Sequence, residues 1–230
     1  MNDNVFNWPT KELTIAFIRW LLIVITAFFA VYFSSNSYAA SKIDHYHLYA
    51  NWELSIPLVP FMVIVYMSYV LIFLVVLFVF KTPHAIKSLA YSMLVTTGVA
   101  GLIFVFFPGH LGYHRPEYVP GYNFLFEFLY VIDEPHNLFP SLHVTYATLC
   151  VMTMIHQTNK SWFHILLKTW FIIVCASVVL VHQHHLFDIA SGCALAGIAY
   201  KMVFLKMVEK PERQQQQSIR EGSYQSDTQL

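Results

Sequence analysis

Long apolar runs, separated by short polar stretches, dominate the pattern of this chain. A transmembrane helix needs roughly 20 mostly apolar residues, and six stretches reach or approach that length. They are Leu13–Phe33, Ile56–Phe80, Ser88–Phe107, Leu142–Ile155, Phe163–Val181 and Leu186–Leu205. The fourth is the shortest, so we expect it to include polar residues at one end. The pattern predicts an all-α polytopic membrane bundle of six transmembrane helices.

The chain divides into a membrane domain and a tail. Tight connections at Lys81–Lys87 and His156–Trp162 are typical of antiparallel neighbouring helices. We therefore assign residues 1–208 to one six-helix domain. Residues 209–230 are polar, include the run Gln214–Gln217 and show no apolar period. This composition predicts a disordered cytoplasmic tail.

The basic residues predict the orientation of the helices. Lys and Arg collect on the cytoplasmic side of membrane proteins. With an internal N-terminus, one side of this chain takes most of them: Lys11, Arg19, Lys81, Lys87, Lys160, Lys168, Lys201, Lys206, Lys210, Arg213 and Arg220. The other side keeps Lys42 and Arg115. Both termini are therefore predicted to be cytoplasmic, and the segments 34–55 and 108–140 to face the periplasm, the cell exterior or an organelle lumen.

Composition narrows the class of protein further. Hydrophobic residues make up 57% of the chain and charged residues 11%, whereas a soluble domain carries about 25% charged residues. The formal net charge is zero, so no electrostatic basis for binding nucleic acid exists. The three cysteines show neither disulfide nor metal-ligand spacing. The bilayer is thus the expected partner, and a homo-oligomer is compatible with such a bundle.

Two histidine-containing segments carry the candidate chemistry. Pro140-Ser141-Leu142-His143 opens the fourth predicted helix, and free backbone N–H groups at a helix start form a ready anion site. His184 and Asp188 are spaced i,i+4 and share one helical face. A carboxylate there can hold one imidazole nitrogen and leave the other free to attack. One helix down and one back return both histidines to the outer side.

These segments resemble the motifs of the type 2 phosphatidic acid phosphatase superfamily, a family of six-helix membrane proteins. Its middle motif, Pro-Ser-Gly-His, is similar to residues 140–143, and its third motif ends in His-x-x-x-Asp, as at His184 and Asp188. Its first motif ends in Arg-Pro, similar to Arg115-Pro116. The order of the motifs, their spacing and their membrane side all agree, so the resemblance covers roughly residues 101–205.

The resemblance implies hydrolysis of a lipid phosphate or diphosphate through a phosphohistidine, without a cofactor and without a metal. His184 would be the nucleophile, Asp188 would orient it, and His143 would protonate the departing lipid oxygen. The expected phosphate-binding residues are Arg115, Ser141, Asn137 and His182.

Two departures from the family motifs leave the acceptor open. The first motif has a lysine seven positions before its arginine, where this chain has Pro108, and the third has an arginine six positions before its histidine, where this chain has Val178. Leu142 in place of glycine occurs in a branch that includes lipid phosphotransferases. An inositol phosphorylceramide or sphingomyelin synthase-like transferase using the same histidine pair is therefore an alternative.

A second alternative is a histidine-ligated metal oxidoreductase. It is prompted by the runs His182-Gln183-His184-His185 and His45-Tyr46-His47. Membrane desaturases bind iron through several histidine boxes, but a partner box with His-x-x-x-His spacing is missing here, and the Pro-Ser-x-His segment is left unexplained.

Overall fold

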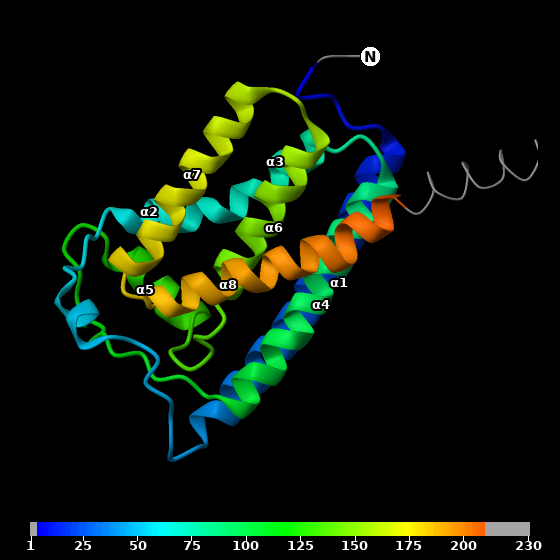
Figure 1. Cartoon of the computed structure of the whole chain (residues 1–230). Helices are drawn as coiled ribbons and strands as arrows, with labels where there is room; N and C mark the ends of the chain where they lie inside the picture. Colours follow the sequence, from blue (N-terminus) through cyan, green and yellow to red (C-terminus); the bar gives the residue numbers. More distant parts are fainter. Residues whose placement is uncertain (1–3, 210–230) are drawn as a thin grey trace, which may run out of the picture.

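The computed structural model describes residues 4–209, which form helices and connecting loops (Figure 1). The helices in chain order are α1 (Lys11–Ala40), α2 (Met62–Met67), α3 (Leu71–Val79), α4 (Pro83–Phe106), α5 (Asn123–Ile132), α6 (Leu142–Gln157), α7 (Ser161–Leu180) and α8 (Leu186–Ala199). Short 3₁₀ segments cover Asn51–Ser55 and Ser68–Val70, and a π-helical segment, Tyr200–Phe204, extends α8. Extended pairing within the described residues is one isolated bridge, Tyr46 with Gly109. The all-α class is confirmed.

Five of these helices are long and apolar enough to cross a bilayer. They are Lys11–Ala40, Met62–Val79, Pro83–Phe106, Ser161–Leu180 and Leu186–Glu209, the second combining α2 and α3. The chain is accordingly a multi-pass membrane protein by the length and composition of its helices. The predicted count of six is not confirmed, because α6 has 16 residues and is about 24 Å long, short of the roughly 30 Å hydrocarbon core.

The position of α6 explains its composition. It lies at the centre of the bundle and packs against α3, α4, α7 and α8 (Figure 1). Most of its side chains are buried. Because protein rather than lipid surrounds it, α6 tolerates threonines whose hydroxyls bond to carbonyls of the preceding turn.

Two predicted boundaries are wrong, and one helix was not predicted. Helix α1 continues to Ala40, seven residues past the predicted end at Phe33. The second span begins at Met62 rather than Ile56, because loop contacts hold the preceding residues: the Ile56 carbonyl bonds to a histidine ring of a distant loop. The outward segment 108–140 contains α5, which has ten residues and was too short to stand out as a span.

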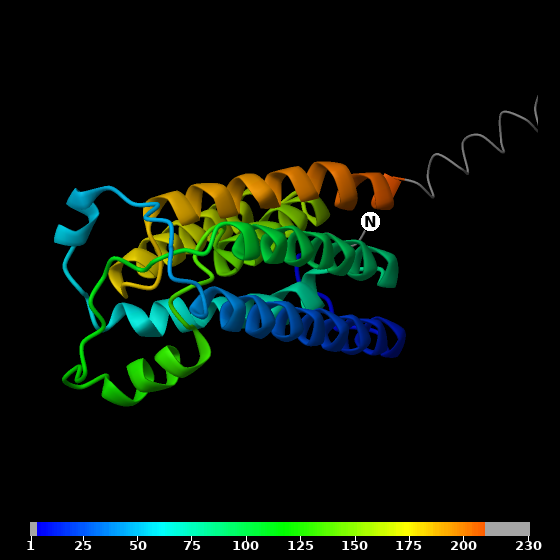
Figure 2. The same ribbon diagram turned by 90° about the horizontal axis from the view of Figure 1, so that it is seen from below.

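Successive long helices alternate in direction, so the connections gather at two ends. Lys11 and Glu209 lie at one end, and the loops that carry the sequence motifs lie at the other (Figures 1 and 2). Helix α5 lies at this motif end beside the bundle (Figure 2). The predicted tail falls outside the described residues except for Glu209.

One glycine sets the contact that builds the motif end. Gly192 of α8 packs directly on the start of α6, and a methyl group placed on it would lie 2.8 Å from the Ser141 carbonyl oxygen. The Ser141 N–H donates to the Asp188 carbonyl at 3.2 Å. The starts of α6 and α8 are thus held together by backbone contacts.

Candidate active site

The structure brings His143 and His184 together. His143 lies in the first turn of α6, whose N-cap is Ser141, and its side chain is 13% exposed. His184 lies in the short connection between α7 and α8 and is 2% exposed. Their ring centroids are 5.9 Å apart and the ring planes are inclined at 61° to each other. A phosphoryl group between them would therefore contact both imidazoles.

His184 has one nitrogen occupied and one free. Its Nδ1 lies 3.3 Å from Oδ2 of Asp188. The same oxygen accepts the His185 backbone N–H at 2.9 Å, which fixes the carboxylate at the start of α8. Nε2 of His184 is buried and makes no hydrogen bond within the described part of the chain. A buried polar atom without a partner is costly, so this nitrogen is positioned to meet a ligand.

Asp133 forms a cluster with His143 and His184. Sequence alone did not predict it as a site residue. It directly follows α5 and is 5% exposed. Oδ2 lies 3.9 Å from Nδ1 of His143. The hydroxyls of Tyr32 and Tyr66 donate to Oδ1 and Oδ2, each at 2.8 Å. Asp133 and Glu134 are adjacent acids in the sequence, and only the fold shows which of them contacts the histidines.

Tyr66 links Asp133 to His143. Its hydroxyl lies 3.2 Å from Nε2 of His143. A tyrosine hydroxyl has one proton, and when that proton is donated to Asp133 the oxygen accepts one from His143. Tyr66 and Asp133 together therefore support an imidazolium at His143.

Acids and imidazoles of the cluster favour each other's charged forms, whereas the two imidazoles, His143 and His184, disfavour each other's. Burial opposes ionisation of Asp133, but attraction to His143 and His184 and the two tyrosine hydroxyls hold its pKa below the usual value. Burial also opposes a charged His184, but the hydrogen bond to Asp188 and the two nearby carboxylates raise the pKa of His184 above its ordinary value. The site is thus arranged as alternating acids and imidazoles.

Arg115 extends into the same cluster from the loop after α4. One terminal nitrogen donates to the Asp133 carbonyl at 2.6 Å and to Oε1 of Gln183 at 3.0 Å. Its guanidinium lies over the ring of Tyr130, 4.7 Å from the centroid. The Nε is buried and makes no hydrogen bond within residues 4–209. One guanidinium donor of Arg115 therefore remains without a partner next to the Asp133 backbone.

The other expected phosphate ligands are placed differently. Ser141 lies at the site, where its Oγ accepts the Val144 N–H at 3.4 Å as the N-cap of α6. Asn137 directs its amide nitrogen to α1, donating to the Tyr32 carbonyl and to Ser35 Oγ. His182, at a positive φ of 58°, bonds to the Ile56 carbonyl at 3.0 Å. The geometry supports a phosphate contact for Ser141 and gives none to Asn137 or His182.

A ring stack explains what His182 does instead. Tyr113 lies between His182 and His185, with centroid distances of 4.1 and 4.5 Å, and Tyr49 covers the far side of His185 at 4.3 Å. Glu53, which is 4% exposed, accepts the Leu186 N–H at 2.8 Å. This stack and the Glu53 carboxylate fix the start of α8, and with it the neighbouring His184. Sequence spacing contains no signal for this arrangement.

The two positions that depart from the family motifs, Pro108 and Val178, are both buried in the structure. Pro108 is buried and its carbonyl accepts the Tyr46 N–H. Val178 is fully buried in a cluster with Val63, Tyr66 and Val144. These positions therefore belong to the packing behind the site.

The three central residues also have the geometry of a candidate metal site. Asp133, His143 and His184 offer ligand atoms that all lie within 4.8 Å of one another. Two imidazoles and a carboxylate suit several divalent transition metals. The same arrangement also suits phosphoryl transfer. The family to which the chain belongs helps to distinguish phosphoryl transfer from metal chemistry.

A family model for the PAP2 superfamily matches residues 35–202. The chain belongs to the PAP2 superfamily. The matched region contains all three motif segments and α2 to α8. No curated protein and no solved structure matches this PAP2 chain. Membership in a phosphatase superfamily supports an enzyme with phosphatase-type chemistry and favours phosphoryl transfer over metal redox chemistry at the histidine pair.

Proposed function

We propose that this PAP2 protein hydrolyses the phosphate or diphosphate of a membrane lipid through a phosphohistidine at His184. The observation that carries the proposal is the state of His184. Its Nδ1 is held by Asp188, its buried Nε2 has no partner within the described residues, and its ring lies 5.9 Å from that of His143. A nucleophile oriented by an acid and facing a second proton carrier is the arrangement that covalent catalysis needs.

In the first step, Nε2 of His184 attacks phosphorus and the bond from phosphorus to the lipid oxygen breaks. His143, as imidazolium, gives its proton to the departing oxygen. The Nδ1 proton stays on His184 and is donated in a hydrogen bond to Asp188, whose carboxylate stabilises the positive charge that develops on the ring. The phosphoryl group is then bound to Nε2.

In the second step, neutral His143 takes a proton from a water molecule, whose oxygen attacks phosphorus. The phosphorus–nitrogen bond breaks, inorganic phosphate leaves, and both histidines return to their initial protonation states. Arg115, Ser141 and the amides at the start of α6 would hold the phosphoryl oxygens. Asp133 would keep His143 in position and support its charge.

The membrane side of the site is part of the proposal. The basic residues predict that the motif end faces the periplasm, the exterior or a lumen, with both termini cytoplasmic. Lys11, Lys81 and Lys160 lie at or just before the starts of α1, α4 and α7. These helix starts lie at the end of the bundle opposite the starts of α6 and α8 (Figure 1), which supports this orientation. Cysteine labelling with a membrane-impermeant reagent, at Tyr118 of the motif end and at Lys81, tests it.

A second candidate is transfer of the phosphoryl-containing group to an alcohol of another lipid. The observation that favours it is the burial of His184, which is 2% exposed and offers little access to bulk water. An acceptor alcohol bound at the site would then compete well with water. The same residues would act, with His143 taking the proton of the alcohol in the second step.

The test is trapping of the covalent intermediate. Purified protein is incubated with ³²P-labelled phosphatidate, phosphatidylglycerophosphate or isoprenyl diphosphate and quenched in alkali. We expect an acid-labile, base-stable label on His184 and release of phosphate, both lost in His184→Ala. A ceramide or diacylglycerol acceptor added to the assay identifies transfer. Equal phosphate release by the wild type and His184→Ala would rule out the hydrolase.

A further inference from the structure

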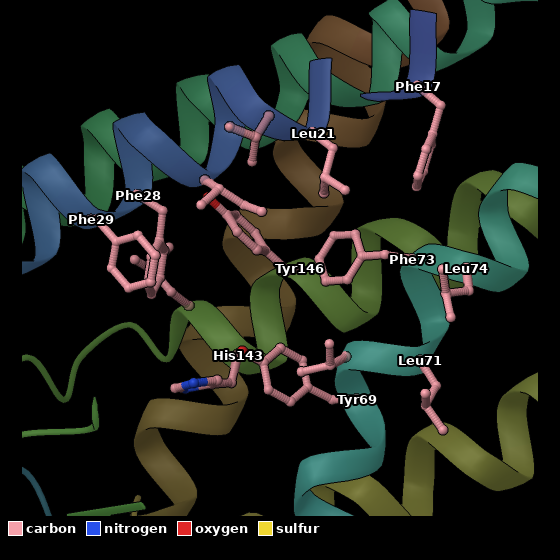
Figure 3. Close-up of a pocket in the computed structure, with 14 residues that line it drawn as sticks. Phe17, Leu21, Phe28, Phe29, Tyr69, Leu71, Phe73, Leu74, His143 and Tyr146 are labelled. Atoms are coloured by element: carbon pink, nitrogen blue, oxygen red, sulfur yellow. The ribbon is translucent and has the colours of Figure 1, made fainter. Parts of the chain in front are cut away.

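An apolar cavity of about 400 Å³ lies between α1, α3 and α6 (Figure 3). Phe17, Leu21, Phe28 and Phe29 point into it from α1, opposite side chains of α3 and of the segment before it. The polar side chains of its lining are His143, Tyr69 and Tyr146. The cavity is therefore a hydrocarbon-lined groove with its polar groups on the side of α6 and of the turn before α3.

The groove is continuous with the active site. His143 lies at one end of the lining, near Phe28 and Phe29, and Phe17 lies at the other end (Figure 3). A molecule whose phosphorus contacts His143 thus has a continuous apolar path along α1, directed away from the motif end.

The length of the groove matches one leaflet of a bilayer. Phe17 and Phe29 are twelve residues apart on α1, which is about 18 Å along the helix axis. One leaflet contributes about half of a hydrocarbon core of about 30 Å. The range from Phe17 to Phe29 also falls inside the first candidate span. A chain in this groove would therefore lie within the hydrocarbon core of the bilayer.

The groove is open to the surrounding lipid. Several lining side chains are strongly exposed, with exposed fractions of 40% to 58%: Ile25, Phe29, Val70, Leu71 and Leu74. They belong to α1 and to the start of α3, which border the opening. A lipid can enter sideways between these two helices without leaving the apolar phase.

We propose that this groove binds one hydrocarbon chain of the lipid substrate and delivers its phosphate to the histidine pair. The inference rests on the proposed function and adds the place and number of the chains. A volume of about 400 Å³ lies near the lower end of the range for ligand pockets, roughly 300–1,000 Å³. It suits one chain, so a second chain of the same lipid stays in the bilayer.

The groove acts by orientation more than by affinity. The interior of a bilayer is as apolar as the groove, so moving a chain from one to the other gains little free energy. Fixing the chain along α1 instead fixes the position of the attached phosphate, which converts a random encounter into a near-attack geometry. A chain too short to reach Phe17 loses part of this constraint.

Neighbouring leucines of α1 provide a matched test. Leu21 lines the groove, whereas Leu22 is 59% exposed and lies outside its lining. Phosphate release is measured with dipalmitoyl and dioctanoyl phosphatidate at equal mole fraction in mixed micelles. Leu21→Trp is expected to lower kcat/KM for the palmitoyl lipid about tenfold more than for the octanoyl lipid, because the indole fills the distal groove. Leu22→Trp should match the wild type with both lipids, and equal behaviour of the two variants would overturn the proposal.

Photolabelling tests the groove without turnover. The His184→Ala protein is loaded with phosphatidate whose palmitoyl chain ends in a diazirine, irradiated and digested. We expect labels concentrated on residues 17–29 and 69–74. Labels spread equally to Ile165 and Ile172, which face outward on α7, would overturn the groove. Groove labelling without phosphate release by the wild type rejects the proposed hydrolysis alone, whereas release with uniform labelling rejects the groove alone.

Discussion

Replacing Asp133 by asparagine tests whether the cluster needs its second acid, besides Asp188. Asparagine keeps the shape of the side chain and removes its charge. In the structure the carboxylate lies 3.9 Å from His143 Nδ1 and is 5% exposed. At that separation and an effective dielectric constant of about 20, two unit charges attract by about 4 kcal/mol. This is an upper bound on the loss, because Asp188 remains and water relaxes around the new amide.

The expected result for Asp133→Asn is a fall in kcat of about 100- to 1,000-fold, since each 1.4 kcal/mol corresponds to about tenfold in rate. The reason is that His143 loses the anion that supports its imidazolium form. The assay is phosphate release from phosphatidate in mixed micelles, with KM determined separately. We expect KM to change little, because Asp133 does not line the groove proposed to hold the lipid chain.

Glu134 provides the control for that experiment. It is the adjacent carboxylate in the chain, it is exposed, and its side chain contacts Asn36 rather than the histidines. Glu134→Gln should leave kcat within about twofold of the wild type, as is usual for surface substitutions. If Asp133→Asn also stays within that range, Asp133 has no part in supporting His143 and the electrostatic reasoning fails.

Three further predictions follow from the same geometry. Asp188→Asn should shift the rising limb of kcat/KM against pH to lower pH, because His184 must lose its proton to attack and the carboxylate raises its pKa; an unmoved limb would contradict the assignment of the nucleophile. Tyr66→Phe should lower kcat about tenfold by removing a buried hydrogen bond to a charged group, and an unchanged kcat would remove Tyr66 from the proton path. Gly192→Ala should lower the thermal midpoint and the activity together, because its methyl would lie 2.8 Å from the carbonyl oxygen of Ser141 at the start of α6. Gly197→Ala, with open space around it, should be neutral or slightly stabilising. Similar midpoints for the two variants would refute the packing argument.

The sequence predicted the elements whose signal is local and long. Apolar runs identified the five long helices. The spacing of His184 and Asp188 correctly brought the two side chains together, at 3.3 Å, but the predicted shared helical face is wrong, because His184 lies in the connection just before α8. Element ends were less predictable, because α1 continues through a polar stretch to Ala40. The ten-residue α5 was missed since a helix of that length gives no spanning signal. The orientation in the membrane stays a prediction.

The parts of the site that sequence could not provide depend on contacts between distant segments. Asp133 is recognisable only when Tyr32 of α1 and Tyr66 of α2 are seen to bond to it. The role of Glu53 was equally hidden, because the residue whose N–H it accepts, Leu186 at the start of α8, follows it by more than a hundred residues. Asn137 and His182 were expected at the phosphate, but in the structure the side chain of each bonds to a backbone carbonyl elsewhere.

The meeting of the two catalytic candidates depends on one helix contact. His143 and His184 belong to separate segments, and α6 and α8 carry no side chain that ties one imidazole directly to the other. Backbone atoms do this instead: the Ser141 N–H bonds to the Asp188 carbonyl, and Gly192 lets the two helix starts approach. Because Ser141 lies two residues before one histidine and Asp188 four after the other, a shift of this contact moves both rings. The separation of the nucleophile and the acid is therefore set by helix packing. Substitutions at Gly192 should lower the catalytic rate by moving the two rings, although the same two histidines still carry out the reaction.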